Sequence, residues 1–72
     1  MRPAMPEDEL QHAEWRVVIG RRHIARQREL IEEMRASGLK ADLAERLLAL
    51  LISTQRDNEA RRDRLLVGNQ TQ

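Results

Sequence analysis

The sequence predicts an all-α protein, an antiparallel two-helix hairpin that dimerises into a four-helix bundle. Leucine, alanine, arginine and glutamate dominate its 72 residues, and all four are strong helix formers. Prolines occur only at positions 3 and 6, so none interrupts the chain further on. The expected organisation is a disordered segment at 1–5, one hairpin domain at 6–67 with helices at about 6–37 and 41–67 and a turn at 38–40, and a frayed tail at 68–72.

The first predicted helix begins at Pro6, because proline suits a first helical turn and the three acids that follow it favour the positive end of the helix dipole. Its apolar residues fall within about 60° of one another at 100° per residue. A strand over the β-branched run 17–19 would break this stripe and is rejected. The stripe consists of Leu10, Ala13, Val17, Ile24 and Ile31.

Two glycines carry structural predictions. Gly20 lies on the apolar stripe, where it is either tolerated at a cost of about 1 kcal/mol or required by a close approach of the second helix. Gly38 follows Ser37 and is the expected left-handed residue that ends the first helix, with Leu39 supplying the hydrophobic contact that often comes next.

The second helix is expected to begin near residues 40–42. A turn of a few residues makes the two helices antiparallel, so that residues whose numbers add to about 77 face each other. Ile31 then meets Leu47, and Gly20 meets Asp57 and Asn58. The expected inner face of this helix consists of Leu43, Leu47, Leu50, Leu51 and Leu65.

Both helices carry more apolar surface than a lone hairpin can bury, and exposed apolar patches mark protein–protein contacts. We therefore expect a homodimer, or another homo-oligomer, packed around a two-fold axis. A different protein could also cover this surface. The residues predicted to form the interface are Trp15, Ile19, Leu30, Leu48, Leu51 and Leu66.

A polar layer is expected midway along the hairpin, formed by His23, Gln27, Thr54 and Asn58. Such a layer fixes register and oligomeric state. The alternative is a phosphoryl-accepting His23, but His-Ile-Ala-Arg-Gln does not match the context of phosphotransfer domains, and no paired acid or base can be constructed. We predict no enzymatic activity, no catalytic residue and no cofactor.

Metal binding is not predicted either. The chain has no cysteine, and its two histidines lie eleven residues apart on one helix, too far to share an ion. The start of the chain lacks the apolar core of a signal peptide, and no apolar run approaches the ~20 residues that span a bilayer. The sequence thus predicts a cytoplasmic protein without a membrane segment.

Arginines gather between residues 15 and 28 and again near residue 62. Acidic neighbours are expected to pair with most of them, although each exposed ion pair contributes only about 0.2–0.5 kcal/mol. The alternative function is accessory nucleic-acid binding, which we disfavour because no groove-reading motif or aromatic platform accompanies the arginines. The possible phosphate contacts are Arg16, Arg21, Arg22, Arg61 and Arg62.

Residues 21 to 66 resemble a group of short, uncharacterised bacterial helical-hairpin proteins. The shared pattern is Arg-His-Ile-x-x-Gln, a turn glycine, Leu-Leu, and a terminal Arg-x-Leu-Leu. The resemblance implies a hairpin and no particular activity. Those proteins often place Asp-Thr after the turn glycine, where Lys40 and Ala41 stand here, so Asp42 is the expected late N-cap. The matching residues are Arg22, His23, Ile24, Gln27, Gly38, Leu47, Leu48, Arg64, Leu65 and Leu66.

Overall fold

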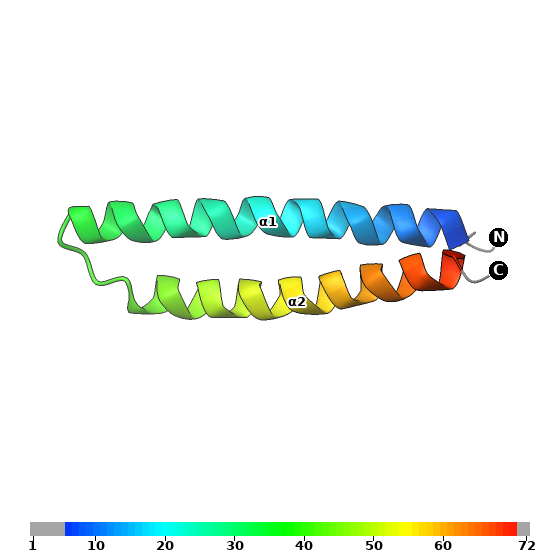
Figure 1. Cartoon of the computed structure of the whole chain (residues 1–72). Coiled ribbons are helices and arrows are strands. Elements are labelled where there is room, and N and C mark those ends of the chain that lie inside the picture. Colours follow the sequence, from blue (N-terminus) through cyan, green and yellow to red (C-terminus); the bar gives the residue numbers. More distant parts are fainter. Residues whose placement is uncertain (1–5, 71–72) are drawn as a thin grey trace, which may run out of the picture.

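The computed structural model describes residues 6–70, with side chains from 8 to 68, and forms a hairpin of two α-helices. Helix α1 spans Pro6–Ala36 and α2 spans Asp42–Gln70. The helices run antiparallel, with the turn at one end and the start of α1 and the end of α2 at the other (Figure 1). The predicted all-α hairpin is confirmed, and the described residues contain no strand. The expected disorder at 1–5 and the last two tail residues lie outside the described range.

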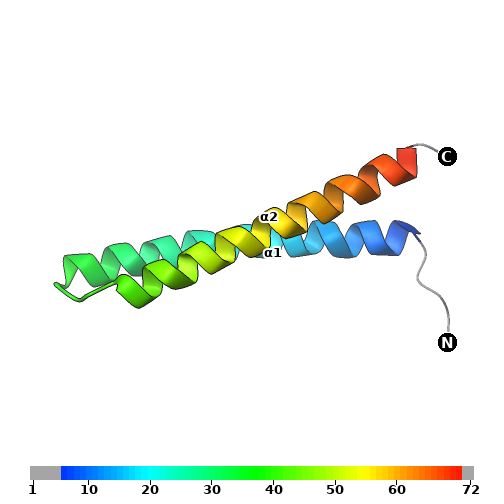
Figure 2. The same ribbon diagram turned by 90° about the horizontal axis from the view of Figure 1, so that it is seen from below.

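The hairpin is a thin rod. Its extents are 54 × 25 × 14 Å, and the smallest of them is little more than the diameter of one helix. The axes of the two helices cross at a small angle, as the second view shows (Figure 2). All tertiary burial within the described chain therefore lies along one line, the seam between α1 and α2.

The seam residues of α1 alternate in steps of three and four, which is the heptad pattern of a coiled coil. Every predicted member of the apolar stripe is buried or half-buried, so this prediction is confirmed. Val17 is the most completely enclosed, at 2% exposed. The full seam row of α1 is Leu10, Ala13, Val17, Gly20, Ile24, Gln27, Ile31 and Met34.

The inner face of α2 differs from the predicted one. Leu43, Leu47 and Leu50 were expected to face α1 but are 77%, 47% and 66% exposed. Two alanines and a glutamine hold seam positions instead. Leu51 and Leu65 do face α1. The row runs from the turn into α2 and consists of Ala41, Ala44, Leu48, Leu51, Gln55, Asn58, Arg62 and Leu65.

The register also differs from the predicted one. Gln55 lies against Gly20, where Asp57 and Asn58 were expected. The difference follows from the same error in the α2 face. Because Ala44 and Leu48 lie in the seam instead of Leu43 and Leu47, α2 is rotated about its own axis relative to the predicted orientation. Its residues therefore meet different partners on α1.

The turn at Gly38 forms the predicted C-terminal cap. Gly38 has a φ of 73°, and its N–H donates to the carbonyl of Arg35 at 3.0 Å. The N–H of Leu39 donates to the carbonyl of Met34 at 2.8 Å, which completes a Schellman motif. Leu39 itself remains exposed, so its hydrophobic contact adds little.

Replacing Gly38 with alanine is expected to lower the free energy of unfolding by roughly 1–2 kcal/mol, because a β-carbon disfavours the left-handed region. Urea denaturation followed by circular dichroism measures the change. Gly38→Asn is the matched control, since asparagine enters this region more readily and is expected to cost less. An alanine variant as stable as wild type would contradict this account of the turn.

The ends of α2 differ slightly from expectation. The carbonyl of Ala41 accepts the N–H of Glu45 at 2.8 Å, so Ala41 is the N-cap residue and Asp42 is the first helical residue rather than the cap. Asp42 and Glu45 still place negative charge at the positive end of the dipole. The helix continues through residues 68–70, which were predicted to fray, because extending a formed helix adds one backbone hydrogen bond per residue.

Candidate functional site

Two glutamines form the buried polar layer of the seam. Gln27 is 8% and Gln55 5% exposed. The Nε2 of Gln27 donates to the carbonyl of Ala44 at 2.9 Å, and the Nε2 of Gln55 donates to the carbonyl of Val17 at 2.8 Å. Each helix therefore reaches across to the backbone of the other. The prediction of Gln27 in this layer agrees with the structure, while Gln55 was missed.

Gly20 creates the space that Gln55 occupies. A β-carbon built on Gly20 would lie 1.7 Å from the Oε1 of Gln55, far inside contact distance. Gly20 is therefore required by the Gln55 side chain of the second helix, and the three atoms nearest to the added β-carbon all belong to that side chain. The same Oε1 is fully buried and has no hydrogen-bond partner among the described residues. The Gln55 amide is thus held by its one hydrogen bond to Val17, and it fits because Gly20 has no side chain opposite it.

The predicted polar layer is wrong at His23 and Thr54, because both are exposed in the single chain. They lie at the edge of the seam, each directly before a seam residue in the sequence. Asn58 is half-buried. All three line a groove of about 250 Å³ on one flank of the hairpin, together with Trp15 and Ile19.

This flank carries an apolar face along much of the rod. His23 and Thr54 mark its position in the groove. Leu30 lies seven residues after His23, and Leu47 and Leu50 lie seven and four before Thr54, so helical periodicity places them on the same side. We call the set the apolar face. Its members are Trp15, Ile19, Leu30, Leu43, Leu47 and Leu50.

The six residues predicted for an interface divide into two groups. Trp15 is 58% exposed and Leu30 is 38% exposed, at different heights along the apolar face; Ile19 is half-buried on the same face. Leu48, Leu51 and Leu66 are half-buried against α1 instead of facing outward. The exposed leucines of α2 lie next to Leu48 and Leu51 in the sequence. The heptad pattern decides which leucines enter the seam, and the number of leucines in the segment does not.

The five arginines predicted to contact phosphate do not form one surface. Arg16 and Arg61 share a groove with Asp8 and Glu9 at the terminal end of the hairpin. Arg21 lies elsewhere, on the flank opposite the apolar face. Arg22 is exposed, and Arg62 sits in the seam and pairs with Asp63 at 2.9 Å.

Ion pairs neutralise fewer arginines than expected. Within the described residues only three arginines form them. Arg26 pairs with two glutamates of its own helix, and Arg35 of α1 pairs with Glu45 of α2 across the turn end. The bordering acids Glu14, Asp57 and Glu59 form no ion pair in this part of the chain. Most arginines in the described part of the chain therefore have no carboxylate partner.

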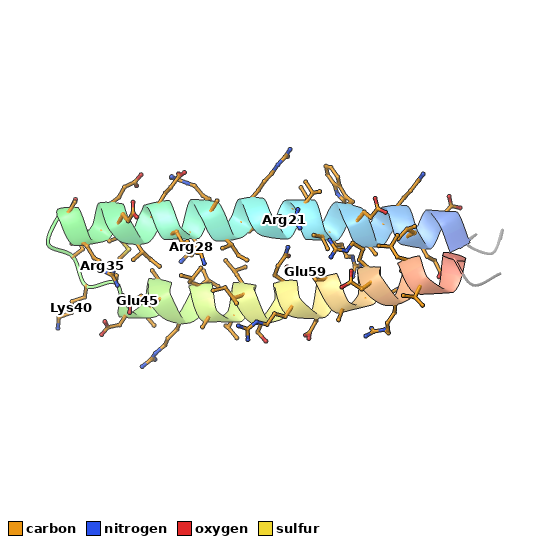
Figure 3. All side chains as sticks on the ribbon, in the orientation of Figure 1. Arg21, Arg28, Arg35, Lys40, Glu45 and Glu59 are labelled. Atoms are coloured by element: carbon orange, nitrogen blue, oxygen red, sulfur yellow. The ribbon has the colours of Figure 1, made fainter. Side chains whose placement is uncertain are left out.

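A second groove of about 600 Å³ lies on the flank opposite the apolar face. We call it the basic groove. Its floor is apolar, formed by Ile24, Ala25 and Ile52 beside Gln55. Three arginines and one acid form its edges: Arg21, Arg28, Arg56 and Glu59. Arg21, Arg28 and Arg35 follow one another along α1, facing Glu45 and Glu59 on α2 (Figure 3).

The described residues contain no group of three or more side chains that could hold a metal ion. No helix among them is long and apolar enough to cross a membrane. The features that remain as candidates for function are two surfaces, the apolar face and the basic groove.

No protein-family model, curated protein or solved structure matches this chain. The resemblance to short bacterial hairpin proteins accordingly stays a prediction, and the fold rests on the helices and seam described above.

Proposed function

We propose that this protein is a small non-enzymatic interaction module that associates with a second copy of itself through the apolar face. One observation carries the proposal: six apolar side chains occupy one flank of a rod whose described residues form no third element to cover them. Exposed apolar surface on one side of a protein marks protein contacts. Two hairpins joined along such a flank would form a four-helix bundle.

The apolar face suits a helical partner of similar length. Its leucines on α2 are spaced in steps of four and three, the pattern that packs into the grooves of another helix. The groove of about 250 Å³ beside Trp15 offers a site for an inserted side chain. A second copy supplies both the leucine row and the groove, which is the requirement of a two-fold interface.

The alternative of accessory nucleic-acid binding has less support. The arginines nominated for it lie on different sides of the rod, and two of them share their groove with acids. Phosphate binding requires cations that act together on one surface.

Sedimentation velocity over a range of concentrations tests the proposal, with tryptophan fluorescence as a second measurement. Trp15 is the chain's single tryptophan, so its emission reports on the apolar face alone. We expect dimers at micromolar concentration and a blue shift of the emission as they form. A folded monomer with unchanged emission across the range would overturn the proposal.

A further inference from the structure

The basic groove lies on the flank opposite the apolar face and remains open if the hairpin dimerises there. It continues toward the turn as a second groove of about 330 Å³, because Arg28 lines both, and the name basic groove covers the two together from here on. Arg21 and Arg35 mark its two ends on α1. These ends are fourteen residues apart, or about 21 Å at 1.5 Å per residue. This length corresponds to four turns of a helix laid alongside.

The charges of the basic groove are arranged in a row. Arg21, Arg28 and Arg35 recur every seven residues, so all three lie on one edge of α1. Only Arg35 has an acidic partner, Glu45. Arg28 forms no ion pair with the acids that line the groove, which are Glu32, Glu45 and Glu59, and Arg56 adds a further unpaired cation on α2.

We propose that the basic groove binds an amphipathic helix of a partner protein whose apolar stripe is bordered by acidic residues. Such a helix would lay its stripe on Ile24 and Ile52, as helix-in-groove complexes do. Its acids, repeating every seven residues, would meet Arg21 and Arg28. The arginines of the groove and the acids of the partner helix would both repeat every seven residues, so opposite charges would face each other along the groove.

A nucleic acid fits the basic groove less well. The apolar floor offers nothing to a sugar-phosphate backbone, and none of the lining residues is aromatic. A protein helix uses both the floor and the arginines.

Fluorescence anisotropy tests this proposal with the full chain and a labelled helical peptide of about 21 residues, with leucines at its heptad core positions and glutamates beside them. We expect the peptide to bind and the variant carrying Arg28→Glu and Arg56→Glu to lose at least about tenfold in affinity. Both arginines are exposed, so these substitutions are expected to preserve the fold.

The matched control carries Arg16→Glu and Arg61→Glu. It changes the net charge equally on the other flank and is expected to bind the peptide within about twofold of wild type. Equal loss in both variants would show general charge attraction and overturn the proposal. So would the absence of binding, equal binding of a peptide with lysines in place of the glutamates, or tighter binding of a DNA duplex.

The variant with Leu47→Glu and Leu50→Glu separates this proposal from self-association. These residues lie on the apolar face, away from the basic groove, so peptide affinity is expected to stay within about twofold of wild type whether or not dimers form. Loss of peptide binding in this variant would place the peptide on the apolar face and overturn the groove assignment.

Discussion

A variant carrying Leu47→Glu and Leu50→Glu is expected to remain a folded monomer at concentrations where the wild-type protein is a dimer. Burying a leucine side chain contributes about 1.5–3 kcal/mol, and a two-fold interface contains each residue twice, so the four leucines account for roughly 10⁴ or more in the dissociation constant. Both side chains are exposed in the single chain, so their loss leaves the seam of the hairpin intact. Sedimentation velocity measures the association, and circular dichroism measures the helix content.

The matched control places two glutamates on the outer side of the same helix, with Ser53→Glu and Ala60→Glu. Both positions are exposed and lie seven residues apart, away from the apolar face. This variant carries the same added charge and is expected to dimerise as wild type does. If the two variants dissociate alike, charge repulsion and not the apolar face governs association.

Replacing Gly20 with alanine is expected to destabilise the wild-type protein by about 1 kcal/mol and to stabilise a Gln55→Ala variant by a similar amount. Alanine favours the helix by roughly 1 kcal/mol over glycine in either background. In wild type the new β-carbon displaces the Gln55 amide, which breaks its bond to Val17 and leaves a buried polar group unpaired, at a cost of about 1–3 kcal/mol. With alanine at 55 that cost disappears.

A double-mutant cycle in urea measures this reversal of sign as a coupling of about 2 kcal/mol. Gly68→Ala serves as the control, because nothing lies within 4 Å of its added β-carbon and its effect is expected to be the same in both backgrounds. Equal effects of Gly20→Ala in the two backgrounds would show that Gln55 has room to move aside, and would remove the role assigned to this glycine.

The sequence predicted α1 better than α2, and the reason is compositional. In α1 the seam positions hold branched residues such as Val17 and Ile31 among charged neighbours, so the stripe stands out. In α2, leucines occur on every side between 43 and 51, and apolar periodicity cannot select one face. Two alanines and Gln55 hold seam positions there, and residues of these types commonly lie at the surface as well.

The candidate surfaces were predictable only in part. An exposed apolar region containing Trp15 and Leu30 followed from their place beside the main stripe, and both residues lie on the apolar face. The leucines of α2 were assigned to the wrong side, for the reason given above. The basic groove was not predicted, although the seven-residue spacing of Arg21, Arg28 and Arg35 is visible in the sequence. Recognising it required the seam register, which is set by Gln55 and Gly20 across the helices.

The thinness of the rod determines how its stability is distributed. Every stretch of the seam is open to solvent on both flanks, so each layer of side chains is supported only by the layers before and after it. The turn with its Schellman motif joins the two helices at one end, while the described residues form no such link at the other end. Opening that begins at the termini therefore passes through the layers in sequence, and backbone amides near the turn are the last to meet water.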